Sequence, residues 1–341
     1  TRKRRQRERI PILKSRLTEK TEDKSMASRK NGNRKRPLKI TGALAAVIVL
    51  VLSLLITFVP EAGLPSWSEL FGAASTGDIT EVGTQEGSPF SVYYLDVGQA
   101  DCELILCGDS AVLIDAGDVD AFPTIDAFLK AKEVKTIQYF ILSHAHADHI
   151  GSADEVLENY TVENVILPKY TEENMPTSTV YEDVLTALSD FQGRVIAAAP
   201  GNTYQLPEFR FTVLAPNADY KELNDTSVVV RAVYGETAFL FQGDAEKKSE
   251  QAILDLGLDV RADVIKLGHH GSTTSSTETY LQAVSPKFAV ISCGENNSYN
   301  FPSQTILKRL DSMGIDYRRT DLNGTITVHS DGHEISVETE R

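Results

Sequence analysis

The segment from Ser143 to His149 constrains this chain most, because it reads Ser-His-Ala-His-Ala-Asp-His and directly follows an apolar stretch. The preceding residues 139–142 read Tyr-Phe-Ile-Leu and predict a buried strand. A loop after such a strand can gather polar side chains without burying them in the core. Neutral imidazole and carboxylate are ligands that suit zinc and related divalent ions. The pattern therefore predicts a metal centre with two neighbouring half-sites, formed by His144, His146, Asp148 and His149. The alternative, a chance polar loop, would leave four ligand-type side chains without partners.

Charge divides the chain into two unlike parts. Residues 1–40 contain 16 of the 34 Lys and Arg residues but only 4 of the 48 Asp and Glu residues, which leaves a net charge of −26 for the remainder. The basic part has no apolar periodicity, so we expect residues 1–39 to be a disordered tail.

Residues 40–59 form a run of 20 residues without a charge, ended by Pro60 and Glu61. As a helix this run is long enough to span a bilayer. The lysines and arginines just before it place the tail in the cytoplasm and the following residues outside the cell. A cleaved signal peptide is the alternative, but its apolar region is usually only about 7–15 residues long. We therefore predict a single-pass membrane anchor.

The rest of the chain divides into a spacer and a folded region. Residues 60–88 are rich in Gly, Ser, Thr and Glu and predict a flexible linker. From residue 89 to 341, β-rich runs alternate with helical stretches, and several β-runs are grouped in pairs. This order favours an α/β fold with two sheets covered by helices over one doubly wound sheet. We expect helices near residues 122–131, 151–160, 180–191, 245–256, 278–284 and 303–313.

The three cysteines lack C-x-x-C spacing and their odd number argues against a disulfide scaffold, so we expect buried free thiols at Cys102, Cys107 and Cys293.

The H-x-H-x-D-H segment resembles the signature of the metallo-β-lactamase superfamily. Four further stretches resemble the lactamase-like domain of ComEC-type DNA-uptake proteins, over about residues 90–338. They are Asp96 to Asp101 (DVGQAD), Leu113 to Gly117 (LIDAG), Phe241 to Asp244 (FQGD) and Gly268 to Ser272 (GHHGS). The resemblance implies an αββα metallo-β-lactamase sandwich, here preceded by one transmembrane helix.

The resemblance also implies roles for individual residues. His144 and His146 would hold one divalent ion, Asp148 and His149 a second, and Asp244 would bridge them. The ions would be zinc, with manganese as an alternative. One of His269 and His270 would complete the metal site or donate a proton to the leaving group, and the sequence does not say which; a helix-capping loop is the alternative. Asp148, His269 and His270 are the candidate catalytic residues, and His269 is the candidate further ligand.

Orienting roles are expected for several neighbours. Asp115 either hydrogen-bonds a ligand histidine or is a turn carboxylate before Gly117. Asp101 either orients the loop beside the metals or caps local structure. Further orienting candidates are Asp96, Asp225 and Ser272.

The chain departs from the family pattern in two places. No histidine lies between His149 and His269, where many members have a ligand, and Asp225 is the strongest ligand type near that position. Phe301 replaces a family histidine. His329 and His333, on the closing strands, are expected at the surface.

A metal-bound hydroxide would support hydrolysis, and the resemblance points to phosphodiesters, with DNA as the first candidate. The acidic charge opposes binding of a long polyanion, unless a local basic stripe overcomes it, formed by Lys266, Lys287, Lys308, Arg309, Arg318 and Arg319. A catalytically silent extracellular binding module and a small-molecule esterase or lactamase are the alternatives. No Gly-rich nucleotide-cofactor loop is visible, and the oligomeric state stays open.

Overall fold

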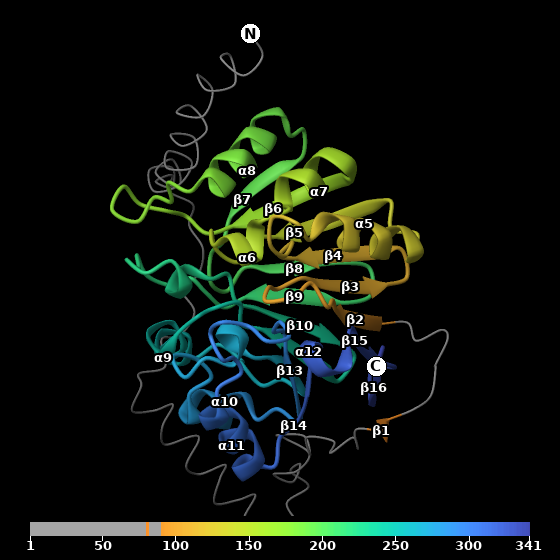
Figure 1. The fold of residues 1–341 in the computed structure, drawn as a ribbon, viewed down its shortest axis with the longest axis vertical. Coiled ribbons are helices and arrows are strands. Elements are labelled where there is room, and N and C mark those ends of the chain that lie inside the picture. Colours follow the sequence, from red (N-terminus) through yellow and green to blue (C-terminus); the bar gives the residue numbers. More distant parts are fainter. Residues whose placement is uncertain (1–79, 82–89) are drawn as a thin grey trace, which may run out of the picture. The chain divides into compact units, whose positions relative to one another are not determined.

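The computed structural model describes residues 80–81 and 90–341 (Figure 1). The predicted tail 1–39, the predicted anchor 40–59 and all of the predicted linker 60–88 except residues 80–81 lie outside the described residues. Among the described residues 80–81 and 90–341, no helix is both long and apolar enough to cross a bilayer.

The first of two sheets has nine strands in the order β1-β16-β15-β2-β3-β4-β5-β6-β7. Its β4–β7 half is parallel, whereas β15, β16 and β2 to β4 pair as antiparallel neighbours. In chain order its strands are β1 (Thr80–Glu81), β2 (Phe90–Tyr94), β3 (Glu103–Cys107), β4 (Ser110–Ile114), β5 (Thr136–Ile141), β6 (Thr161–Leu167), β7 (Arg194–Ala197), β15 (Ile326–Ser330) and β16 (Ile335–Thr339).

The second sheet has seven strands in the order β14-β13-β12-β11-β10-β9-β8. It is parallel from β11 to β14 and antiparallel from β8 to β11. In chain order its strands are β8 (Thr203–Gln205), β9 (Arg210–Val213), β10 (Val230–Tyr234), β11 (Thr237–Phe241), β12 (Val264–Lys266), β13 (Phe288–Ile291) and β14 (Asp316–Arg319).

Helices cover the outer face of each sheet (Figure 1). The first sheet is covered by α5 (Phe122–Ala131), α7 (Ala153–Asn159) and α8 (Thr179–Asp190), and the short α6 (Ala147–Ile150) precedes α7. The second sheet is covered by α9 (Lys247–Asp255), α10 (Glu278–Val284) and α11 (Gln304–Met313). Shorter helical turns are η2 (Asn224–Thr226), η3 (Gly268–Gly271) and α12 (Thr320–Asn323).

Three apolar layers hold this arrangement together. The middle layer takes side chains from both sheets, and strand β11 shows how: Phe239 and Phe241 enter it, while Ala238 and Leu240 enter the layer beneath the helices. Successive side chains of a strand point to opposite faces, so a strand buried on both faces reads as a continuous apolar run. The layers confirm the predicted αββα sandwich.

The sequence did not predict four strands, and all four are sheet edges. β1 and β7 end the first sheet, and β8 and β14 end the second. Edge strands bury less apolar surface, so their sequences carry little alternation. The strand β14, for example, reads Asp-Tyr-Arg-Arg and is exposed or half-buried along its length.

The predictions for the cysteines and for two histidines have different outcomes. The three cysteines are buried free thiols, as predicted. The prediction for His329 was wrong: it is buried, and its Nδ1 lies 2.8 Å from Ser91 Oγ. The reason is that β15 lies inside the first sheet, between β16 and β2. His333, in the turn that follows, is exposed as predicted.

Replacing Phe239 by alanine tests the middle layer. Phe239 is fully buried and its ring centroid lies 5.0 Å from that of Phe90. We expect Phe239→Ala to lower the free energy of unfolding by about 3–5 kcal/mol, because it opens a cavity between the sheets. Urea denaturation measures the change, with the exposed Leu256→Ala as a control expected within about 0.5 kcal/mol of the wild type. Equal stability of Phe239→Ala and wild type would contradict this packing.

Candidate metal centre

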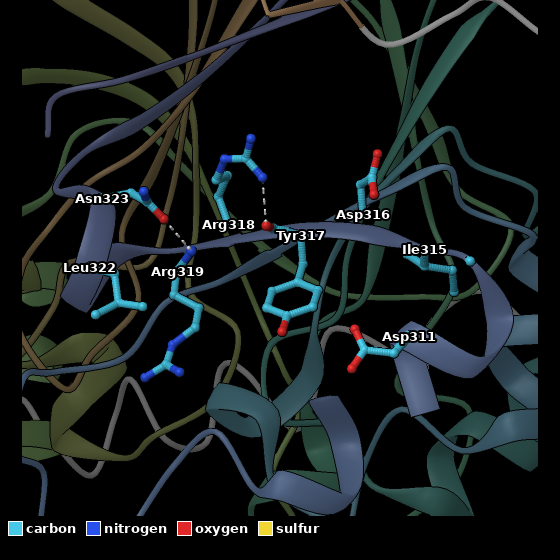
Figure 2. Close-up of a pocket in the computed structure, with 9 residues that line it drawn as sticks. Asp311, Ile315, Asp316, Tyr317, Arg318, Arg319, Leu322 and Asn323 are labelled. Atoms are coloured by element: carbon cyan, nitrogen blue, oxygen red, sulfur yellow. Dashed lines mark hydrogen bonds between the residues drawn. The ribbon is translucent and has the colours of Figure 1, made fainter. Parts of the chain in front are cut away.

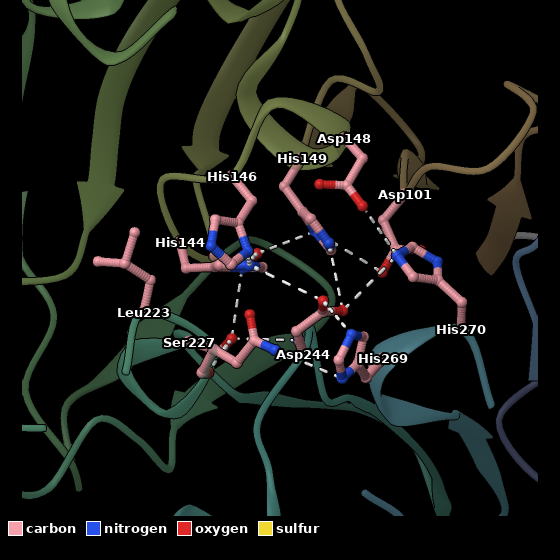
Figure 3. A network of polar contacts seen from close by, with 12 residues as sticks. Asp101, His144, His146, Asp148, His149, Leu223, Ser227, Asp244, His269 and His270 are labelled. Atoms are coloured by element: carbon pink, nitrogen blue, oxygen red, sulfur yellow. Dashed lines mark hydrogen bonds and ion pairs between the residues drawn. The ribbon is translucent and has the colours of Figure 1, made fainter. Parts of the chain in front are cut away.

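The site collects loops that follow strands of both sheets. From the first sheet come the segment His144 to His149, after β5, and Asp115, after β4. From the second come Asp244, after β11, and the pair His269 and His270, after β12. These strands belong to the parallel halves of their sheets, whose carboxyl ends share one edge. Figure 3 shows the histidine side chains of both sheets gathered around Asp244.

Three groups of possible metal ligands lie at or beside Asp244, each with ligand atoms within 4.8 Å of one another. The groups are His144, His146 and Asp244; Asp148, His149 and His270; and Asp101, His149 and Asp244. One oxygen of Asp244, Oδ2, lies 3.8 Å from His144 Nε2, and the other, Oδ1, lies 3.2 Å from His149 Nε2. Each carboxylate oxygen therefore faces a different group.

The donor atoms fit divalent cations. His149 Nε2 and Asp244 Oδ1 are buried and face each other at 3.2 Å without forming a hydrogen bond. Buried polar atoms without hydrogen bonds are costly, and a coordinated ion would satisfy both atoms. Nitrogen and oxygen donors of this mixture are those that zinc and other transition-metal ions accept.

The charges of the cluster also favour a cation. Burial would raise the pKa of Asp244, but His149 and His270 hold it well below its usual value, so the carboxyl is ionised. Burial likewise disfavours a charged His149, yet Asp244 and Asp115 raise the pKa of that imidazole well above its usual value. The carboxylates thus require positive charge beside them, which protons supply here and metal ions would supply in their place.

Asp115 lies behind His149. Its Oδ2 is 2.7 Å from His149 Nδ1, the contact that the sequence predicts as one of two alternatives. Asp115 also accepts hydrogen bonds from the backbone N–H and the hydroxyl of Ser143. A carboxylate on one imidazole nitrogen orients the ring and leaves the other nitrogen for a metal.

Asp101 forms a second support, and its partner corrects a prediction. Lys266, expected in a surface stripe for nucleic acid, is buried, and its Nζ lies 2.7 Å from Asp101 Oδ2. Asp101 Oδ1 lies 3.2 Å from His270 Nδ1. Burial alone would raise the pKa of Asp101, but Lys266 and His270 lower it to about 2. Lys266 was misread because β12 lies between β11 and β13, where a lysine has to find a buried partner.

The structure separates the two adjacent histidines. The His270 ring is buried, with Nε2 3.3 Å from Asp148 Oδ2. His269 lies at the rim: its Nε2 is 3.7 Å from Asp244 Oδ2 and its Nδ1 is 3.1 Å from Thr274 Oγ1. Both residues have left-handed backbones, with φ of 51° and 52°. Among the described residues, the ligand groups include His270 but not His269, whereas the sequence-based prediction named His269 as the further ligand.

Three predicted orienting residues lie outside the ligand groups. Asp225 accepts hydrogen bonds from the backbone N–H of Glu246 and Ser249 at the beginning of α9. Ser272 contacts Thr274, and Asp96 pairs with Arg341. Asp225 is therefore engaged at the beginning of α9 and is absent from the ligand groups of the described residues.

A cavity of about 360 Å³ opens onto the cluster. The sequence interpretation did not assign a role to its outer wall, Tyr299 and Phe301, because exposure cannot be read from the sequence. The wall's inner ring, Phe301, lies edge-on to His269, with ring centroids 5.5 Å apart. The cavity is lined by Gln99, His146, Ala147, Asp148, Asn224, Asp244, His269, His270, Tyr299 and Phe301.

Of the remaining residues of the predicted basic stripe, Lys308 is exposed and the others contact groups away from the cluster. A cavity of about 610 Å³ lies along β14. Arg318 Nη1 donates there to the carbonyl oxygen of Tyr317 (Figure 2). Arg319 pairs with Asp321 and Lys287 with Asp263. None of these basic residues lines the cavity above the metal cluster.

Two helix-covered sheets with a histidine and aspartate cluster where their parallel strands end define a metallo-β-lactamase fold. The chain belongs to the Metallo-beta-lactamase superfamily, whose sequence profile matches residues 95–295.

Its relatives include the competence proteins that the sequence motifs resemble, which confirms that resemblance. ComE operon protein 3 of Bacillus subtilis (strain 168) is 36% identical over 200 residues, which is 58% of this chain and 25% of that protein. Competence protein ComA of Neisseria gonorrhoeae is 29% identical over 288 residues, which is 83% of this chain and 38% of that protein. The chain thus spans well under half the length of either relative.

Among solved structures, the metallo-beta-lactamase fold protein YhfI of Bacillus subtilis is 13% identical, with a TM-score of 0.45 over 67% of this chain and 95% of that one.

The Lys266–Asp101 pair can be tested by stability. Lys266→Met leaves a buried carboxylate uncompensated, so we expect it to lower the free energy of unfolding by about 3–5 kcal/mol. Adding Asp101→Asn to Lys266→Met removes the unpaired negative charge, so the double variant should regain most of the lost stability. Urea denaturation measures both, with the exposed Lys308→Met as a matched control. A single variant as stable as the wild type would show that the ion pair is not formed.

Proposed function

We propose that this chain is a metal-dependent phosphodiesterase held at the outer face of a cell membrane. The observation that carries the proposal is the position of Asp244, whose two oxygens face two separate groups of imidazole and carboxylate donors. That arrangement suits a pair of divalent ions about 3.5–4 Å apart, which is typical of two-metal hydrolases.

The residues of the site divide into those that would bind the ions and those that orient the binding residues. His144 and His146 would hold one ion, Asp148, His149 and His270 the other, and Asp244 both. Zinc suits these donors, with manganese as the alternative. Bound ions would supply Lewis-acid activation of water and of the scissile ester. His149 Nδ1 lies 2.7 Å from Asp115 Oδ2, and His270 Nδ1 lies 3.0 Å from the carbonyl oxygen of Ser292, with Asp101 Oδ1 at 3.2 Å. These contacts orient both rings and would leave their Nε2 atoms to the ions.

His269 is the candidate proton donor to the leaving group. Its ring is partly exposed at the cavity, while its Nδ1 contacts Thr274 Oγ1 at 3.1 Å and so leaves Nε2 directed at Asp244. A group at the rim can reach a leaving oxygen without displacing a ligand, which is the position that general acid catalysis requires.

The substrate class rests on the relatives and on charge. The relatives are named for competence, and we extend that context to this chain as a proposal. Residues 41–341 carry a net charge of −26, and no lysine or arginine lines the described cavity. Long duplex DNA would be repelled, so a single-stranded or short phosphodiester is the favoured substrate. The apolar run 40–59 would anchor the enzyme with its catalytic domain outside the cell.

A catalytically silent binding module of the same fold is the second candidate. It is favoured by the missing histidine between His149 and His269 and by Phe301 in place of a family histidine.

Metal content and activity separate the two candidates. We expect the full chain to bind divalent metal and to hydrolyse a chromogenic phosphodiester. Asp244→Asn should lower activity by at least about 100-fold, because it weakens the ligand shared by both groups. Elemental analysis and initial rates measure the effects, with the exposed His333→Ala as control. Metal binding without hydrolysis would leave the silent module as the function.

The two adjacent histidines should behave differently. His270→Ala should lower the amount of metal bound per chain, because His270 lies in a ligand group. His269→Ala should leave metal content near the wild-type value while lowering kcat, by about 100-fold for loss of a general acid. Metal titration followed by calorimetry distinguishes the two variants. Loss of metal in His269→Ala alone would reverse the assignment.

A further inference from the structure

An aromatic pair forms the outer wall of the cavity above the metal cluster. The rings of Tyr299 and Phe301 are stacked, with centroids 5.6 Å apart and planes 16° from parallel. Tyr299 is 65% exposed, among the most exposed large hydrophobic residues of the described chain. Phe301 in turn contacts His269 edge-on. The aromatic surface therefore begins beside the candidate proton donor and extends toward solvent.

The loop that carries the pair is held in place by hydrogen bonds. The side chain of Asn297 donates from Nδ2 to the carbonyl oxygens of Gly294 and Phe301 and accepts from the backbone N–H of Phe301. Gln99 Oε1 accepts from the N–H of Gly294 and joins the loop to the segment between β2 and β3. A ring held by its own loop loses little conformational entropy when a ligand packs on it.

The acidic lining of the cavity explains why an aromatic surface would help to bind a substrate. Its walls contain Asp148 and Asp244 but no lysine or arginine within the described residues. A phosphodiester strand therefore gains nothing there from the basic contacts that usually hold its backbone. Base stacking on an aromatic ring, in contrast, does not depend on charge or on base sequence.

We propose that Tyr299 and Phe301 form a stacking platform for a nucleobase of a single-stranded oligonucleotide whose phosphodiester lies at the metal cluster. The proposal rests on the function proposed above and adds a substrate class to it. A base paired inside a duplex has both faces covered by its neighbours, so the platform favours unpaired strands. Phe301 thus contributes a second ring to the apolar contact with the substrate.

Binding tests the platform without requiring catalysis. The full, metal-loaded chain is titrated into two fluorescein-labelled phosphorothioate tetramers, one of thymidine and one abasic, and anisotropy is recorded. The two probes have the same charge and backbone, so their affinity ratio isolates stacking. We expect the thymidine tetramer to bind about 5- to 100-fold more tightly. Equal affinity of the two probes for the wild-type chain would overturn the proposal.

Variants then show which residue produces the preference for the thymidine tetramer. Tyr299→Ala should bring the affinity ratio close to one, whereas Tyr299→Phe and Phe301→Trp keep an aromatic face and should preserve it. Leu322→Ala removes a similarly exposed apolar side chain outside the cavity and serves as the matched control. A preference that survives Tyr299→Ala, or that Leu322→Ala also removes, would overturn the platform.

Hydrolysis of unmodified tetramers separates this proposal from the enzymatic one. If the wild type hydrolyses neither tetramer but prefers the thymidine probe through Tyr299, the phosphodiesterase proposal fails and the platform stands. If it hydrolyses both with equal kcat/KM and binds both probes equally, the enzymatic proposal stands and the platform fails.

Discussion

The burial of carboxylates beside imidazoles is the constraint on which the rest of this structure depends. Asp101, Asp115 and Asp244 are all buried, and an isolated carboxylate in such a place would be strongly unfavourable. Lys266 compensates Asp101, while His149 lies between two carboxylates, 2.7 Å from Asp115 and 3.2 Å from Asp244. Because one imidazole serves both of these carboxylates, negative charge remains at Asp244 and attracts a cation.

The fold supplies this compensation by bringing two sheets together along one edge. Lys266 belongs to the second sheet and Asp101 to a loop of the first, 165 positions away in sequence. The left-handed backbones of His269 and His270 send one ring into the cluster and the other to the rim. The two neighbouring residues thereby take different positions: that of His270 suits a metal ligand, and that of His269 suits a general acid.

Local sequence motifs predicted much of the fold and of the candidate site. Features that depend on long-range packing could not be predicted. The segment from His144 to His149 was readable because its ligand-type residues follow a strand directly. The central strands were readable because burial on both faces produces continuous apolar runs, whereas the four edge strands carry no such pattern. Lys266 was misread since sequence does not tell a lysine on a central strand from one on a surface. The choice between His269 and His270 depends on backbone angles that no spacing reveals.

The division of the ligands between the sheets has a mechanical consequence. The segment His144 to His149 follows a strand of one sheet, and Asp244 and His270 follow strands of the other. Ions coordinated by both would act as a cross-link between the halves of the sandwich, in a domain whose cysteines are unpaired. A ligand that binds only the native state adds to its stability in proportion to the logarithm of ligand concentration. Removal of the ions by a chelator would therefore weaken the contact between the two sheets. Metal supply would then govern the lifetime of the folded chain as well as its chemistry.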